Sequence, residues 1–261
     1  MRPIYTTKKL LKLSLPRRTQ LALRSAVNRT KGEVLSLGSS VECPICGQTF
    51  FSFLSFCGRR NEWCPFCRSL GRHRLTYLYL RDRTDLLSGR RPIRILHVGP
   101  EFCLRPVLAS VPRAIYLSTD LMVSIVDLLE IRPDIRMSVT DACFPSDMFD
   151  LAVCSHVLEH VKKDQQALAE LFRVMKIGGI AIVPVPINWT SAITQEKDGL
   201  NAAQRAELYG EADHVRQYGR DYLDRLSEAG FGTELYRPEP ASLGVQYRID
   251  MNDPLVVAHK L

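Results

Sequence analysis

The stretch that decides the fold lies in residues 140–161, which read TDACFPSDMFDLAVCSHVLEHV. Its middle part, residues 147–156, is mostly apolar and predicts a buried strand that ends near Cys154. The residues that follow, 162–176, place apolar side chains three and four positions apart, which predicts a helix. A buried strand that leads into an amphipathic helix is one unit of an α/β fold.

The same alternation continues on both sides of this stretch. Short apolar runs predict strands, and runs with helical spacing predict helices between them. The predicted strands are residues 93–99, 114–120, 178–186, 233–237 and 254–260, and further helices are predicted at residues 75–87, 104–111 and 221–231. This alternation indicates βαβ units and a parallel sheet.

Charge is distributed unevenly along the 261 residues. Residues 1–40 carry a net charge of +8 and residues 41–91 carry +5, whereas residues 92–261 carry −6. A basic front and an acidic back suggest separate roles for the two parts. Since no apolar run approaches the ~20 residues of a membrane span and the N-terminus lacks a secretory pattern, we expect a cytoplasmic protein.

The eight cysteines favour metal binding or buried thiols over disulfides, because the chain lacks a secretory pattern. Four of them form two CPxC pairs separated by 17 residues, Cys43 with Cys46 and Cys64 with Cys67. Two such turns converge on one tetrahedral zinc ion and leave no open position, so we predict a structural zinc ribbon. We interpret most of the others as small buried hydrophobic residues; they are Cys57, Cys103, Cys143 and Cys154.

Four parts of the chain are therefore expected. They are a basic N-terminal arm at residues 1–40, the zinc ribbon at 41–74, a linking helix at 75–91 and an α/β domain at 92–261. The arm has three possible partners: nucleic acid, an anionic lipid surface or the acidic domain of the same chain.

Polar motifs follow several predicted strands, which is where open α/β sheets bind ligands. Gly99 and Glu101 follow the first strand in the sequence GPE, Asp120 ends the second strand, and Asp141 follows the third. An acid at the position of Asp120 can accept hydrogen bonds from ribose hydroxyls, and Asp141 can accept one from an adenine amino group. These positions predict a nucleoside-containing cofactor.

From about residue 92 to the end, the chain resembles the class I S-adenosylmethionine-dependent methyltransferases, especially those of the type 11 group. The resemblance depends on the order and spacing of motifs that are weak individually. They are LHVG at 96–99, the acid at 120, TDACFP at 140–145, LEH at 158–160 and FRVMKIGG at 172–179. The resemblance implies a Rossmann-like seven-stranded sheet, and the ribbon ahead of it looks like a branch that pairs the two modules.

The resemblance also implies which residues hold S-adenosylmethionine at the strand ends. A glycine would let the backbone approach the methionine part, an acid would bind the ribose, an acid and an alanine would frame the adenine, and a serine would face the sulfonium. The residues are Gly99 with Glu101, Asp120 with Leu121, Asp141 with Ala142, and Ser155. The chain departs from the family pattern at His97, where an acid is usual, and at Glu101, where a second glycine is usual. Glu101 would restore the missing negative charge.

Methyl transfer is an in-line displacement in which the enzyme aligns the acceptor and excludes water, and a base is needed only when the acceptor loses a proton. We select two candidate catalytic residues. His156 lies near the expected methyl site, and His214 lies in the insertion between the fifth strand and the last helix, where this fold often builds a lid. Glu159 and His160 are the other candidates.

The acceptor is less closely specified. Arg216 and Tyr218 beside His214 would bind an anionic or hydroxylated acceptor, and the signature of exocyclic-amine methylation is absent after the fourth strand. A small molecule, sugar or biosynthetic intermediate is the leading prediction. RNA is the alternative, because a basic arm, a basic ribbon and an acidic catalytic domain together resemble the layout of some zinc-containing ribosomal RNA methyltransferases. The ribbon also mixes cations with aromatic residues, although Phe50, Phe51 and Phe53 equally suit packing inside it. A non-catalytic interaction module is the third possibility.

Overall fold

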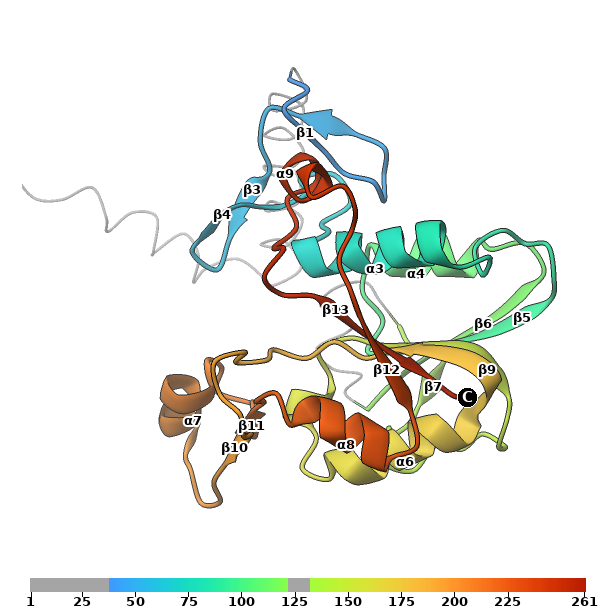
Figure 1. Cartoon of the computed structure of the whole chain (residues 1–261), viewed down its shortest axis with the longest axis vertical. Coiled ribbons are helices and arrows are strands. Elements are labelled where there is room, and N and C mark those ends of the chain that lie inside the picture. The colour runs from blue at the N-terminus through green and yellow to red at the C-terminus, as the bar shows by residue number, and fades with distance from the viewer. Residues whose placement is uncertain (1–37, 122–131) are drawn as a thin grey trace, which may run out of the picture.

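The computed structural model describes residues 38–121 and 132–261, so nearly all of the predicted basic arm lies outside the described residues. Its main element is a seven-stranded sheet with the order β12-β13-β9-β8-β5-β6-β7 (Figure 1). The strands are β5 (Ile93–Val98), β6 (Ala114–Asp120), β7 (Ile135–Arg136), β8 (Phe149–Cys154), β9 (Met175–Ile182), β12 (Gly232–Tyr236) and β13 (Leu255–His259). The first five are parallel, and β13 runs antiparallel between β9 and β12. The predicted α/β class and seven-stranded Rossmann-like sheet are confirmed.

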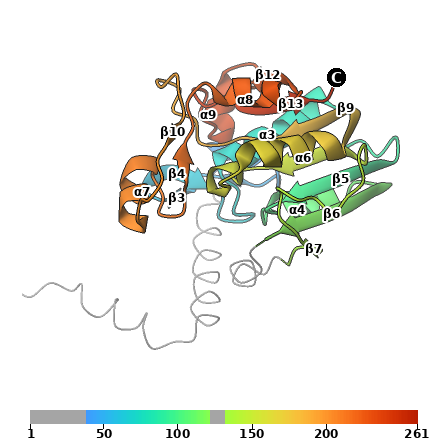
Figure 2. The same ribbon diagram turned by 90° about the horizontal axis from the view of Figure 1, so that it is seen from below.

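Helices cover both faces of the sheet (Figures 1 and 2). One face packs on α6 (Asp164–Val174) and α8 (Tyr222–Glu228). The other packs on α3 (Gly71–Arg83), α4 (Leu104–Ala109) and α9 (Ser242–Tyr247). Alternate residues of each central strand enter opposite cores, which explains why these strands are mostly apolar.

The ribbon consists of two short hairpins, β1 (Val41–Glu42) with β2 (Thr49–Phe50) and β3 (Leu54–Phe56) with β4 (Arg59–Trp63). The rings of Phe50 and Phe53 are buried in the small core of the ribbon, with their centroids 5.7 Å apart. Phe51, by contrast, is 67% exposed. Two of the three phenylalanines therefore pack inside the ribbon, which is one of the two roles predicted for them from the sequence.

One buried side chain, Arg74 of α3, joins the ribbon to the sheet domain. Its guanidinium donates hydrogen bonds to the carbonyl oxygens of Glu62 and Ser69 in the ribbon, at 3.0 and 2.8 Å. It also donates to the carbonyls of Tyr247 and Arg248, at 2.6 and 2.8 Å, at the end of α9. Since Arg74 is 0% exposed, these bonds replace the water that its charge would otherwise require.

Helix α3 begins at Gly71, four residues before the predicted start at 75, because side chains satisfy its first amide groups. The backbone N–H of Gly71 donates to Oε1 of Glu62 at 2.8 Å, and that of Leu70 donates to Nδ1 of His73 at 3.1 Å. Helix α6 ends at Val174, two residues before the predicted end, because β9 already begins at Met175. Local periodicity does not determine such boundaries.

The insertion, which we define as residues 183–221, leaves the sheet from the carboxyl end of β9 and projects to the left in Figure 1. It contains α7 (Ala202–Tyr209) and a hairpin of β10 (Gln195–Glu196) with β11 (Arg216–Gln217). The side chain of Asn201 caps α7. Across residues 38–121 and 132–261, no helix has the length and hydropathy that crossing a membrane requires.

Candidate active site

Gly99 follows β5 and turns the chain across the edge of the sheet. Its φ is +62°, and a Cβ atom there would lie 2.9 Å from Cγ2 of Val157. Its N–H donates to the carbonyl of Thr119, at the end of the neighbouring strand β6, at 2.8 Å. A glycine is therefore needed for both the left-handed conformation and the close approach of two loops.

Glu101, two residues later, turns its carboxylate back toward the sheet. Its Oε2 lies 2.5 Å from Nε2 of His97, and the other ring nitrogen of His97 lies 2.9 Å from the hydroxyl of Tyr116. Ser155, which follows β8, also helps to lower the pKa of Glu101. His97, which stands where the family usually has an acid, therefore holds Glu101 in place.

Glu101 is ionised at neutral pH even though its side chain is only 14% exposed. Burial acts to raise the pKa of this carboxyl, but the hydrogen bond and charge of His97 outweigh burial, with help from His73 and Ser155, and lower the pKa to about 2. His73 approaches from α3 with its Nε2 3.9 Å from Oε1 of Glu101, and burial lowers its pKa to about 3. No sequence signal pointed to His73, because it lies ahead of the predicted linking helix, at the start of α3, and reaches the loop only in the folded chain.

Three buried polar atoms at this edge have no hydrogen-bond partner among the described residues: Oε1 of Glu101, Oγ1 of Thr119 and Nε2 of His73. Such atoms are costly unless a ligand or water satisfies them. A free oxygen on an ionised, buried carboxylate suits the ammonium group of the amino acid part of S-adenosylmethionine. Together with the cradle at Gly99, these atoms fit the cofactor that the resemblance implies.

The remaining cofactor candidates lie at the same edge with different exposures. Asp120 ends β6 and is partly buried, and Leu121 after it is 54% exposed. Asp141 is exposed. The N–H of Ala142 donates to Oε2 of Glu170 at 2.9 Å, so this amide is already engaged within the protein.

The four candidate bases converge after β8. His156 has a φ of +54°, and its Nδ1 lies 3.2 Å from Oε1 of Glu159. Glu159 and His160 belong to the 3-10 helix η2 (Leu158–His160), and the ring of His160 packs edge-on against that of His214 with centroids 4.8 Å apart. The structure thus brings together His156 and His214, the two selected residues, through Glu159 and His160.

Arg216 does not face an acceptor, contrary to the expectation from sequence. It is 2% exposed, and it donates to the carbonyls of Leu158, Val161 and Lys162 at 2.9, 2.5 and 2.9 Å. It also pairs with Glu196 at 2.8 Å. Arg216 therefore fastens η2 to the insertion.

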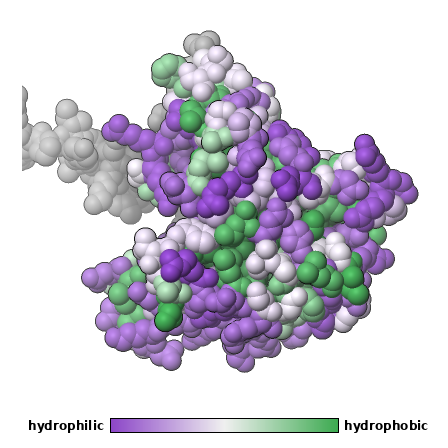
Figure 3. All heavy atoms as spheres, viewed as in Figure 1, coloured by the Kyte–Doolittle hydropathy of each residue, from purple (hydrophilic) through white to green (hydrophobic). Residues whose placement is uncertain are grey.

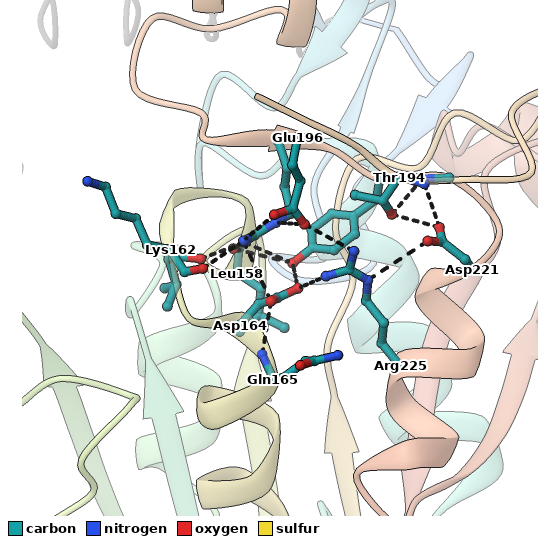
Figure 4. A network of polar contacts seen from close by, with 12 residues as sticks. Leu158, Lys162, Asp164, Gln165, Thr194, Glu196, Asp221 and Arg225 are labelled. Carbon is teal, nitrogen blue, oxygen red and sulfur yellow. Dashed lines mark hydrogen bonds and ion pairs between the residues drawn. The ribbon is translucent and has the colours of Figure 1, made fainter. Parts of the chain in front are cut away.

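Two further buried groups complete this network, which Figure 4 shows from close by. The hydroxyl of Tyr218 donates to Oδ2 of Asp164 at 2.9 Å, and Arg225 of α8 pairs with the same carboxylate at 2.8 Å. Tyr218 is 0% exposed, so it too is a structural residue and not an acceptor ligand.

The four ribbon cysteines, Cys43, Cys46, Cys64 and Cys67, place their sulfur atoms within 4.8 Å of one another. Two of the separations are 3.4 and 3.8 Å, close to the ~3.8 Å between thiolates bound to one zinc ion by bonds of about 2.3 Å. The two CPxC turns also match in backbone geometry, since Gly47 and Arg68 after them have φ values of +68° and +64°. This arrangement fits a closed zinc site.

The remaining cysteines lie apart from that cluster. Cys103 and Cys154 are buried as expected, whereas Cys57 and Cys143 are exposed. The interpretation as buried hydrophobic residues therefore holds for two of the four.

Residues 109–183 match the family model of the methyltransferase domain. No curated protein matches the chain.

Several solved structures are similar to this chain. The cyclase SpnF has 14% identity and a TM-score of 0.50, over 94% of this chain and 97% of SpnF. An S-adenosylmethionine dependent methyltransferase from Mesorhizobium loti has 18% identity and a TM-score of 0.46, over 66% of this chain and 94% of that one. A chain of the complex between the Haloferax volcanii Trm112 methyltransferase activator and a methyltransferase has 14% identity and a TM-score of 0.45, over 72% and 94%. The sheet order, the strand-end cradle and the family match together identify this chain as one that contains an S-adenosylmethionine-dependent class I methyltransferase domain, preceded by a four-cysteine cluster that fits a zinc ribbon.

Proposed function

We propose that this enzyme methylates a small molecule, such as a sugar or biosynthetic intermediate, at a group that must lose a proton. The observation that supports an acceptor that loses a proton is the convergence of four candidate bases after β8. They are His156, Glu159, His160 and His214. A protic acceptor needs a base beside the methyl donor, whereas an acceptor that is already nucleophilic does not.

The cofactor supplies an electrophilic methyl group on a positively charged sulfur. Glu101 would hold the amino acid part through its free oxygen, Asp120 and Leu121 would receive the ribose, and Asp141 with Ala142 would lie against the adenine. Ser155, which helps to lower the pKa of Glu101, connects the cofactor loop to His156, the next residue along the chain. His156 receives the acceptor proton, and its contact with Glu159 stabilises the imidazolium that results. His214 lines the insertion side and is held by the carbonyl of Tyr209 at 3.0 Å.

Calorimetric titration of S-adenosylmethionine and S-adenosylhomocysteine tests the cofactor half of this proposal. We expect micromolar binding that Asp120→Ala and Glu101→Gln both weaken, while Glu207→Gln on the exposed face of α7 leaves it unchanged. Absence of binding to folded wild-type protein would refute the proposal. Transfer of labelled methyl groups from S-adenosylmethionine to a panel of hydroxylated small molecules then tests the acceptor half.

RNA is a second candidate acceptor because of the surface of the ribbon. Phe51 and Phe66 are 67% and 64% exposed, and Arg59 and Arg60 on β4 are exposed as well. Exposed aromatic rings beside arginines suit stacking on unpaired bases. The face drawn in Figure 3 is mostly hydrophilic, with hydrophobic residues gathered in its middle below the ribbon. RNA affinity that falls steeply with salt and is lost in Phe66→Ala would favour this candidate.

A further inference from the structure

We propose that Glu159, His160 and His214 bind a divalent transition-metal ion, which orients a hydroxyl of the acceptor and makes it more acidic. One ligand atom from each of these residues lies within 4.8 Å of the other two. Two imidazoles and one carboxylate form a donor set that binds ions such as Zn²⁺, Mn²⁺ and Co²⁺. This inference rests on the proposed function for its chemistry, although the binding site itself does not.

The carboxylate of Glu159 is buried and has a contact on one side only. The residue is 1% exposed, and its Oε2 has no hydrogen-bond partner among the described residues. Its other oxygen contacts Nδ1 of His156 at 3.2 Å. A buried carboxylate that is satisfied on one side only is costly unless a cation or a donor completes it.

Both histidines have the outer contacts that orient an imidazole for a metal ion. Nδ1 of His214 lies 3.0 Å from the carbonyl of Tyr209, which can only accept a hydrogen bond, so Nδ1 carries the proton. Nδ1 of His160 lies 3.4 Å from the carboxylate of Asp213. When Nδ1 is the donor, the lone pair of each ring is on its other nitrogen, as in most metal-bound histidines.

The two halves of this metal site come from distant parts of the chain and are held rigidly together. Glu159 and His160 lie on η2, and His214 precedes β11 by two residues. The N–H of Val215 donates to the carbonyl of Glu159 at 2.9 Å, and Arg216 binds three carbonyls of the same segment. The site is therefore prearranged before any ion binds.

Exposure leaves room for the acceptor. Glu159 and His214 are buried, whereas the side chain of His160 is 36% exposed, so three protein ligands leave coordination positions open toward solvent. An open position is the mark of a catalytic ion, in contrast to the closed four-cysteine site. An acceptor hydroxyl bound there would give its proton to His156; its oxygen would then bond to the methyl carbon as the carbon–sulfur bond breaks, with that electron pair remaining on sulfur.

The test uses full-length protein whose ribbon is already loaded with one equivalent of Zn²⁺, titrated with Co²⁺. We expect one further equivalent to bind, with the weak visible bands of nitrogen and oxygen ligation and no thiolate charge-transfer band. His160→Gln is the first variant, because an exposed side chain can be replaced with little effect on folding. It and Glu159→Gln should weaken Co²⁺ binding about 100-fold or more, and Asp213→Asn, through the orientation of His160, about 10- to 100-fold.

His259→Gln is the matched control, because this histidine also pairs with a carboxylate, that of Glu234 at 3.1 Å, but lies on β13. It should bind the further equivalent like wild type. The proposal is overturned if wild type binds no further Co²⁺ or if His160→Gln and Glu159→Gln bind it normally. Loss of Co²⁺ binding in Asp213→Asn alone would also overturn the proposal. The site would then be the neighbouring group of Glu211, Asp213 and His214. Titration of S-adenosylhomocysteine into the same samples reports separately on the proposed function.

Discussion

Replacing Glu101 with glutamine tests whether an ionised carboxylate organises the cofactor loop. The change preserves shape and removes the charge that His97 and Ser155 stabilise. Glutamine resembles the protonated carboxyl. The free energy of unfolding should therefore fall by the amount by which the folded protein favours the ionised form of Glu101 over the protonated form.

The pKa of Glu101 supplies the magnitude. Burial acts to raise it, but the contacts with His97 lower it from its ordinary 4.5 to about 2. A difference of this size corresponds to about 3 kcal/mol of folding free energy. Because the folded value lies below the unfolded one, the contribution is fully present above the unfolded pKa and is lost as the pH falls toward 2.

Urea denaturation of wild type and Glu101→Gln at pH 7 and at several values down to pH 2 measures this difference. We expect the variant to be less stable by about 3 kcal/mol at pH 7, with the gap closing between about pH 4.5 and pH 2. The variant should also bind S-adenosylmethionine about 10- to 150-fold more weakly, as loss of a charged hydrogen bond implies. Equal stabilities at pH 7, or a gap that persists at pH 2, would refute the reasoning. Glu207→Gln serves as the control for the charge change alone.

Three further predictions concern the loop, the zinc site and the joint between the modules. Gly99→Ala should cost about 1–2 kcal/mol and weaken cofactor binding in calorimetry, because alanine disfavours the left-handed conformation and its Cβ would meet Val157. Cys64→Ser, or chelation of the metal, should unfold the ribbon and shift the fluorescence of Trp63, whose indole donates to a carbonyl of the second CPxC turn, while circular dichroism still reports the α/β domain. Arg74→Met should lower the free energy of unfolding by at least about 2 kcal/mol in urea titrations, because two buried and two partly buried carbonyls lose their donor.

Each of these predictions has an outcome that would contradict it. Wild-type cofactor affinity in Gly99→Ala would mean that the loop does not approach the ligand. Unchanged Trp63 fluorescence in Cys64→Ser would show that the ribbon folds without metal. A fully stable Arg74→Met would mean that water replaces the guanidinium in the joint.

Sequence reasoning was sufficient wherever local pattern and spacing carry the information. The central strands are mostly apolar because both faces of the sheet are covered, and the run at 147–156 therefore predicted β8 (Phe149–Cys154). The doubled CPxC motif predicted the cysteine cluster for a similar reason, since each turn is local and only one distance between the turns remains to be set.

The candidate site was predicted only in part. His156, Glu159, His160 and His214 were recognised one by one as possible bases, but 53 residues separate the last two in the sequence. Arg216 was interpreted as an acceptor ligand, whereas it is buried and binds backbone carbonyls. A single sequence does not distinguish a charged residue that meets a ligand from one that meets the backbone, because both uses require the same guanidinium.

By itself, the sequence determined the α/β class, the ribbon cysteines and the strand-end positions where a cofactor would lie, because periodicity and short-range spacing are local properties of the chain. Only the tertiary structure decided that His73 of α3 approaches Glu101, that His97 holds Glu101 ionised and that the insertion brings His214 to His160. The contacts of His73 and His214 join segments distant in sequence, whereas His97 and Glu101 are four residues apart and meet because the chain turns at Gly99. Burial lowers the pKa of His73, and the contacts with His97 lower the pKa of Glu101 against the effect of burial, so both shifts exist only in the folded chain.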